Sequence, residues 1–159
     1  QDLNFAQENI RILSGLYGIL RPLDLMKPYR LEMGTSFANK KGKNLYEYWD
    51  DSLARSIKKD LKSHDETVVI NCASLEYFKA IDRSSLDADV VTPQFKDMKN
   101  GQYKMISFYA KKARGMMARF IIQNRIESVN DILSFNLGGY SYNPSLSLPN
   151  QPVFTRSQS

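Results

Sequence analysis

One stretch of the chain, residues 101–125, combines clustered positive charge with a complete absence of acidic residues. It reads GQYKMISFYAKKARGMMARFIIQNR, and its basic residues are Lys104, Lys111, Lys112, Arg114, Arg119 and Arg125. The whole chain has 22 Lys and Arg against 17 Asp and Glu, a net charge of +5, so without these six residues 16 basic residues remain against 17 acidic ones. Positive charge concentrated on one element is typical of a surface that binds a polyanion, of which nucleic acid is the commonest large example.

From about Ser107 onward this stretch has helical periodicity. One arc of the predicted helix is apolar, with Tyr109, Ala110, Ala113, Met116, Met117, Phe120 and Ile121. The opposite arc holds Lys111, Lys112, Arg114, Arg119 and Arg125, with Gly115 among them. Glycine costs a helix about 1 kcal/mol relative to alanine, but bare backbone lets a bulky anion approach. The alternative is an ordinary amphipathic surface helix, although such helices usually mix acids with their bases.

A second candidate is the glycine-rich turn Ser14–Gly18, with Arg21 just beyond it. If helices flank this turn, it resembles the hairpin of a helix-hairpin-helix DNA-binding element, in which backbone N–H groups face a phosphate. The predicted contacts are Gly15, Leu16, Tyr17, Gly18 and Arg21. Two residues separate the glycines where the usual motif has one. A helix C-cap followed by a packed turn explains the same residues.

A polar cluster follows a predicted strand, at a position where ligands often bind. Its members are Asn71, Ser74, Glu76, Tyr77 and Lys79. Capping and surface hydrogen bonds account for the same residue types. The chain has no G-x-G-x-x-G, P-loop or G-x-S-x-G motif.

The single histidine and the single cysteine, His64 and Cys72, give no support for a zinc site, and no metal or cofactor is predicted. Cys72 lies in an apolar predicted strand, where a reactive thiolate is disfavoured. A length of 159 residues suits one domain. No apolar run reaches the length of a membrane span, and the cytoplasm is the default compartment.

Both helices and strands are predicted around these candidate sites. Helices are predicted to end at Leu13 and to cover 45–61, 75–81 and the region after Ser107, with Ser74 as an N-cap. Strands are predicted at 67–72 and 152–155. A hairpin is predicted from strands at 90–95 and 102–107, joined by the turn Lys99-Asn100-Gly101. Helices and strands mixed without regular βαβ alternation indicate an α+β fold.

Four segments resemble the YaaA family of bacterial peroxide-stress proteins. They are GLYGILRPLDLMKPYRLEMG (15–34), NCASLEYFK (71–79), SFYAKKARGMMARFIIQN (107–124) and FNLGGYSY (135–142). The resemblance implies a role in oxidative stress, DNA binding and a family-specific mixed fold with a basic cleft and a helix-hairpin-helix element. It places the hairpin at Ser14–Arg21 and the family's basic block at Lys111, Lys112, Arg114 and Arg119. It also implies about a hundred further residues before Gln1, a domain-scale segment.

Three functional hypotheses follow. The first is non-specific binding of DNA through its phosphates; with about five phosphates neutralised, log K falls with log salt at a slope near −4.5. The second is an enzyme that acts on a small phosphorylated or anionic substrate, with Asn71, Ser74, Glu76, Tyr77 or Tyr109 supplying polar chemistry. The third is an interaction module for iron or a protein partner, which a ligand-dependent thermal shift would reveal.

Overall fold

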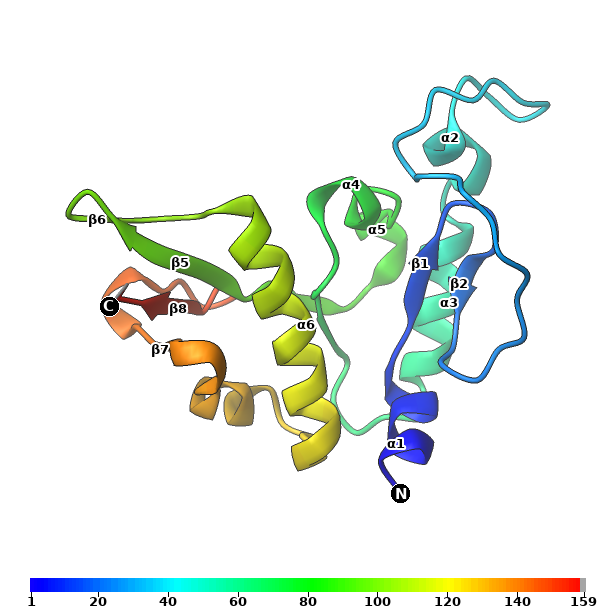
Figure 1. The fold of residues 1–159 in the computed structure, drawn as a ribbon. Helices are drawn as coiled ribbons and strands as arrows, with labels where there is room; N and C mark the ends of the chain where they lie inside the picture. Colours follow the sequence, from blue (N-terminus) through cyan, green and yellow to red (C-terminus); the bar gives the residue numbers. More distant parts are fainter. Residues whose placement is uncertain (158–159) are drawn as a thin grey trace. The chain divides into compact units, whose positions relative to one another are not determined.

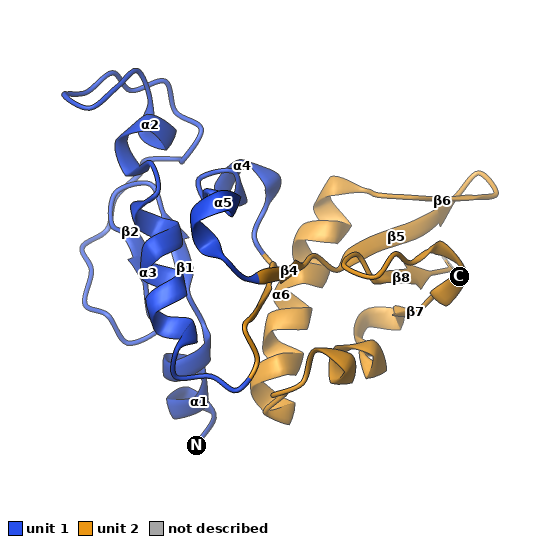
Figure 2. Ribbon diagram, turned by 180° about the vertical axis from the view of Figure 1, so that it is seen from behind, with its two compact units in different colours: residues 1–65, 73–88 blue, residues 66–72, 89–159 orange. Residues whose placement is uncertain are grey.

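The computed structural model describes residues 1–157. Its elements confirm the α+β class, since helices accompany several small sheets. Contacts divide the chain into two compact units, coloured separately in Figure 2: residues 1–65 with 73–88 form unit 1, and residues 66–72 with those from Asp89 onward form unit 2. The prediction of one domain stays a prediction.

Unit 1 consists mainly of short helices around one hairpin. Its elements are α1 (Asp2–Asn9), β1 (Ile12–Ser14), β2 (Gly18–Leu20), α2 (Leu45–Trp49), α3 (Ser52–Leu61), α4 (Leu75–Phe78) and α5 (Arg83–Leu86). The predicted single helix over 45–61 is wrong, because Asp50 adopts a left-handed φ of 48° and separates α2 from α3. Asn44 caps α2 by accepting from the Glu47 amide, and Ser74 caps α4 as predicted.

The segment before the glycine-rich turn is also not helical. β1 and β2 pair antiparallel, with Ser14 opposite Gly18, so strands flank the turn where the sequence predicted helices. The helix α1 ends at Asn9. A three-residue segment such as Ile12–Ser14 is too short for its hydrophobic pattern to distinguish the period of a helix from that of a strand. Its pairing with β2 makes it a strand. The helix-hairpin-helix prediction is therefore wrong in its helical flanks.

Unit 2 contains a four-stranded sheet beside one long helix, α6 (Ser107–Asn124) (Figure 1). The sheet order is β6-β5-β8-β7, with β5 and β8 parallel and both outer pairs antiparallel. Its strands are β5 (Gln94–Lys99), β6 (Gln102–Lys104), β7 (Ser141–Tyr142) and β8 (Val153–Arg156). A separate parallel pair joins β3 (Val68–Ile70) to β4 (Asp89–Val91). Three 3-10 turns complete the unit: η1 (Val129–Ser134), η2 (Leu137–Gly139) and η3 (Pro144–Leu146).

Local signals predicted much of unit 2. Asn100 and Gly101 have φ of 53° and 74°, which is the left-handed pair that a two-residue hairpin turn requires, and they join β5 to β6. The strands predicted at 67–72 and 152–155 appear as β3 and β8. The predicted hairpin strands, 90–95 and 102–107, are wrong in their bounds, because Val90 and Val91 belong to β4, which pairs with β3, and because β6 ends at Lys104 before α6 begins. Within residues 1–157, no helix has both the length and the apolar character needed to cross a bilayer.

An aromatic cluster forms the core of unit 2. Phe95, Phe135, Tyr140 and Phe154 are at most 2% exposed. The ring of Phe95 lies 5.5–5.7 Å from the other three, in edge-on and stacked arrangements. Aromatic pairs at such distances add to the stabilisation that burial of their surface provides. This cluster fixes the inner face of the sheet, from which the candidate site is built.

Candidate anion-binding site

The helix α6 has the two faces that its sequence predicted. Ala110, Ala113, Met117, Phe120 and Ile121 are buried, while Tyr109 and Met116 from the same arc are only partly covered. Lys111, Lys112 and Arg119 are exposed, and so is Arg125 at the C-cap. Arg114 differs from the others because its side chain is half-buried. The helix therefore presents three of the four predicted site cations to solvent.

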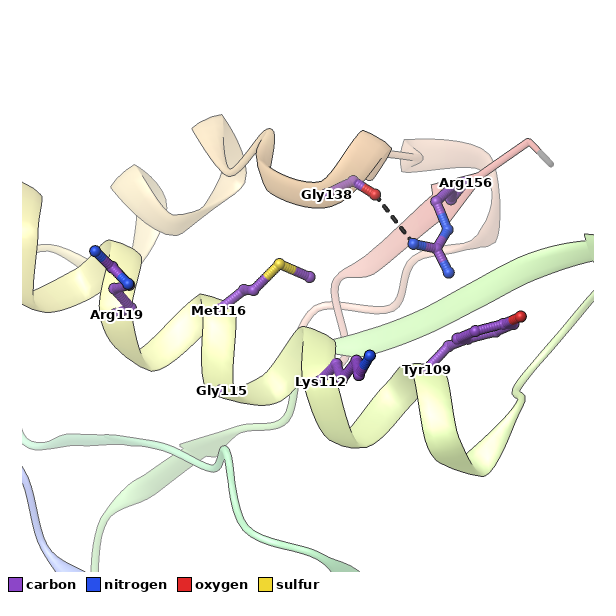
Figure 3. Close-up of a pocket in the computed structure, with 7 residues that line it drawn as sticks. All are labelled: Tyr109, Lys112, Gly115, Met116, Arg119, Gly138 and Arg156. Carbon is purple, nitrogen blue, oxygen red and sulfur yellow. Dashed lines mark hydrogen bonds between the residues drawn. The ribbon is translucent and has the colours of Figure 1, made fainter. Parts of the chain in front are cut away.

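A basic pocket lies against α6 (Figure 3). Its volume is about 520 Å³, and it is lined by Tyr109, Lys112, Gly115, Met116, Arg119, Gly138 and Arg156. Figure 3 shows Lys112 and Met116 leaving the helix toward the segments that carry Gly138 and Arg156. Three of these residues are cationic and none is acidic. The structure thus brings together Lys112 and Arg119 of the predicted site, whereas Lys111 and Arg114 do not line the pocket.

Arg156 enters the pocket from β8 and is held in place by a buried acid. Its Nε donates to Asp97 Oδ1 at 2.6 Å, and the two residues are register partners on the parallel strands β8 and β5. Asp97 is 0% exposed, and its other oxygen accepts from the Tyr140 hydroxyl at 2.8 Å. Burial and this hydrogen bond raise the pKa of Tyr140 to about 12, so the hydroxyl keeps its proton at neutral pH.

Three further contacts fix the Arg156 guanidinium. Its Nη1 donates to the Gly138 carbonyl at 3.1 Å, as the dashed line in Figure 3 marks. Its central carbon lies 4.5 Å from the ring centre of Tyr140 and 4.9 Å from that of Tyr109. Cations attract the faces of aromatic rings. Arg156 is thus oriented by the acid, the carbonyl and the two rings before any ligand arrives.

Two glycines shape the pocket in different ways. Gly138 has a φ of 64°, a conformation that favours glycine, whereas a Cβ there would lie 2.7 Å from Met116 Cε, the flexible end of a side chain that can move aside. Gly115 has helical backbone, and a Cβ there would meet no atom of the described structure within 4 Å. Packing within this chain therefore does not explain the glycine at position 115, and a helix would favour alanine.

Sequence reasoning missed Arg156, Asp97 and Gly138. Asp97 follows Phe95 by two positions on β5, and this alternation places both on the buried face. A lone acid on an apolar strand face was a usable signal that a buried partner must exist. The sequence did not show which residue is that partner, because Arg156 lies 59 positions away from Asp97.

The glycine-rich turn has structural contacts that explain its residues. A Cβ on Gly15 would lie 2.5 Å from the Leu31 carbonyl oxygen, and one on Gly18, where φ is 74°, 2.9 Å from the Trp49 ring. The Tyr17 amide donates to Ser14 Oγ at 2.9 Å, and the Trp49 indole donates to the Gly15 carbonyl at 3.1 Å. Close packing therefore accounts for both glycines.

The exposed residues at this turn, Leu16, Tyr17 and Arg21, differ in their contacts within the protein. Leu16 and Tyr17 are partly exposed, at 48% and 36%. Arg21 is paired with Asp60 at 3.1 Å, and Asp60 also binds Arg11. Arg21 thus has a partner within the chain, and DNA contact by the residues of this turn stays a prediction.

The side chains of the polar cluster after β3 are engaged in contacts within the protein. Asn71 is buried, Ser74 caps α4, and the Glu76 carboxylate accepts from the Gly34 amide at 2.9 Å. The Tyr77 hydroxyl donates to Glu32 at 2.6 Å. Burial and that hydrogen bond raise the pKa of Tyr77 to about 12. These contacts match the capping and surface explanation. Among residues 1–157, no group of three or more His, Cys, Asp or Glu side chains is placed to hold a metal ion.

Cys72 lies just after β3, and burial raises the pKa of its thiol to about 12. The positive charge of Arg114 opposes this shift without cancelling it. The sequence interpretation found no basic residue near Cys72 along the chain, and the tertiary structure supplies one from α6. The thiol is nevertheless held in its protonated, weakly nucleophilic form at neutral pH.

We expect Cys72 in the folded protein to react with iodoacetamide at pH 7 on the order of 100- to 1,000-fold more slowly than in the urea-unfolded protein. The reason is that a pKa of about 12 instead of 9.0 reduces the thiolate fraction by about three powers of ten. Mass spectrometry of a labelling time course measures both rates. Equal rates in the folded and unfolded protein would contradict this assignment.

Comparison with known proteins gives the family. A family model described as peroxide stress protein YaaA matches residues 1–146. A UPF0246 protein of Colwellia psychrerythraea is 56% identical over the whole chain, which covers 62% of that relative. A UPF0246 protein of Idiomarina loihiensis is 58% identical over 96% of this chain, which covers 59% of that relative. One of a Shewanella species is 54% identical over 98% of this chain, which covers 61% of that relative. The chain spans about three fifths of the length of these curated relatives. With the match over residues 1–146 and these identities, the chain belongs to the peroxide stress protein YaaA family.

Proposed function

We propose that the chain serves in the peroxide-stress role of its family by binding DNA through the phosphate backbone along α6. The observation that carries this proposal is the exposed, acid-free basic face of Lys111, Lys112 and Arg119 on one rigid helix. Cations on such a face neutralise phosphates and release the counterions condensed on DNA. The same contacts carry no sequence information, so binding is non-specific.

The proposal rests on α6 and not on the glycine-rich turn. The Tyr17 and Ile19 amides already donate within the turn, to Ser14 Oγ and to the Tyr17 carbonyl. Arg21 is engaged with Asp60. Phosphate contacts by Gly15, Leu16, Tyr17 or Gly18 would add to the affinity that α6 provides, and the proposal does not require them.

A salt titration of duplex-DNA binding by the full-length protein tests this proposal. With the three exposed cations of α6 engaged, log K is expected to fall with log salt at a slope of about −2.7, and further contacts steepen it. The variant Lys111→Glu/Lys112→Glu is expected to bind more weakly and to reduce the magnitude of the slope by about 2, which is about 1 for each phosphate that is no longer neutralised.

The matched control is Lys40→Glu/Lys41→Glu. These two lysines are also adjacent and exposed, and their replacement changes the net charge by the same amount. We expect this control to keep most of the salt slope. If both double variants lose affinity equally, net charge alone explains binding and α6 is not the DNA surface; a wild-type slope near zero would sink the proposal outright.

A second candidate, chemistry on a small phosphorylated substrate, has one observation in its favour. The pocket of about 520 Å³ beside α6 has the size of a small-molecule site and is lined by three cations. The polar cluster at 71–79 gives it no support, because Ser74 caps α4 and the side chains of Glu76 and Tyr77 are engaged with Gly34 and Glu32.

A further inference from the structure

The basic pocket on α6 is more specific than a surface that only attracts DNA. Its volume of about 520 Å³ lies within the range of ligand sites, and it is lined by residues of α6, η2 and β8. Phosphate contacts along a duplex need only exposed cations on a convex surface. A pocket of this volume also has room for one small organic group.

Arg156 has the features of an anchoring residue in this pocket. Asp97 and the Gly138 carbonyl fix its guanidinium through Nε and Nη1, and the rings of Tyr109 and Tyr140 lie 4.9 and 4.5 Å from its central carbon. The remaining nitrogen, Nη2, makes no hydrogen bond with the described residues 1–157, and Arg156 lines the pocket. A guanidinium that is already oriented loses little conformational entropy when it binds an anion.

The charge of the pocket matches a phosphate. Lys112, Arg119 and Arg156 contribute three positive charges, and buried Asp97 behind Arg156 offsets one of them. A phosphomonoester carries a charge of about −1.5 to −2 at neutral pH. The local charge of the pocket and that of such a group therefore nearly cancel.

The remaining lining suits a flat organic group. Met116 and the ring of Tyr109 are apolar surfaces, and Gly115 and Gly138 contribute only backbone. Neither a carboxylate nor a side-chain amide lines the pocket, so its lining away from the three cations is mostly apolar. Gly115 leaves open space where any side chain would project. A bare phosphate would leave this part of the pocket unfilled.

We propose that this pocket binds a nucleoside phosphate, with its phosphate on Arg156, Lys112 and Arg119 and its base against Met116 and Gly115. The ligand comes from one of two sources, a free mononucleotide or the phosphorylated 5′ end of a DNA strand. The inference does not require the non-specific DNA binding proposed above, although it shares Lys112 and Arg119 with it.

Calorimetric titration of the full-length protein with AMP tests the free source, with adenosine and inorganic phosphate as comparisons. AMP is expected to bind more tightly than either comparison. Lys112→Ala is expected to weaken AMP binding about tenfold or more, the loss typical of a hydrogen bond to a charged group. The adjacent Lys111→Ala removes the same charge outside the pocket and is expected to change AMP affinity less than about twofold at physiological salt, where screening is strong.

Gly115→Leu provides an independent variant. Leucine is the better helix former, so the melting temperature is not expected to fall, while the side chain fills the space for the base and abolishes AMP binding. The strand-end source is tested with two duplexes that differ only in a 5′-phosphate. A preference for the phosphorylated duplex that Gly115→Leu removes, and Lys111→Ala keeps, identifies the strand end as the ligand.

Three results would overturn the inference: neither AMP nor the 5′-phosphate is preferred, adenosine binds as well as AMP, or Lys111→Ala and Lys112→Ala weaken AMP binding equally. Failure here is distinguishable from failure of the DNA proposal, because Gly115→Leu leaves every cation of α6 in place and so leaves the salt slope unchanged.

Discussion

Replacing Asp97 with alanine is expected to lower the free energy of unfolding by about 3–5 kcal/mol, because it breaks a buried ion pair and leaves one partner uncompensated. Asp97 is fully buried and accepts from Arg156 at 2.6 Å and from Tyr140 at 2.8 Å. Without it, the Tyr140 hydroxyl and the Arg156 Nε lose their acceptors inside the protein. Urea unfolding followed by circular dichroism measures the loss.

Two variants bracket this effect. Asp97→Asn keeps an oxygen that can accept a hydrogen bond but removes the charge, so its cost is expected to lie between those of alanine and the wild type. Asp89→Ala changes an exposed acid on β4 and is expected to stay within about 0.5 kcal/mol of the wild type. A loss below about 1 kcal/mol for Asp97→Ala would mean that the network does not hold Arg156 in place.

The second large effect is expected at Phe154, the residue on β8 two positions before Arg156. Phe154 is 0% exposed, and its ring lies 5.5 Å from that of Phe95 and 5.4 Å from that of Phe135. Phe154→Ala is expected to cost about 3–5 kcal/mol, since it removes buried apolar surface and leaves a cavity among rings that cannot close around it. The same urea titration reports the difference in unfolding free energy.

The matched control for Phe154 is Phe108→Ala. Phe108 is 62% exposed on the first turn of α6, and its ring lies below the Lys112 ammonium at 4.6 Å. Removing it is expected to change stability by less than about 0.5 kcal/mol, as is usual for exposed positions. Comparable losses at Phe108 and Phe154 would show that the aromatic cluster is not the core that stabilises unit 2.

Both large effects bear on the pocket because they act on β8. The register of β5 and β8 sets Asp97 opposite Arg156 and Phe95 opposite Phe154. The Phe95–Phe154 pair packs the inner face of the two strands, and the neighbouring Asp97–Arg156 ion pair orients the guanidinium. A variant that loosens β8 is therefore expected to weaken AMP binding together with stability, whereas Lys112→Ala weakens AMP binding alone.

Several features of this protein were determined by short stretches of its sequence. The α+β class, the period of α6, the Asn100-Gly101 turn and the Ser74 cap all depend on residues within one or two turns of each other. Local backbone preferences and hydrophobic periodicity determine such features, so they can be predicted from one segment without knowing which other segment packs against it. The family followed from longer ordered segments and is confirmed by the match over residues 1–146.

Other features depended on contacts between distant segments. The β1–β2 hairpin replaced an expected helix because Ile12–Ser14 is too short for its own period to decide, and pairing with β2 decides instead. The basic pocket was likewise hidden from the sequence. Its anchor, Arg156, has its acid 59 residues away on a neighbouring strand, and Gly138 approaches Met116 from a separate turn. The sequence alone determined which helix carries the positive charge; only the tertiary structure decided which of its cations line a pocket, because strand register and burial are set by the packing of the whole unit.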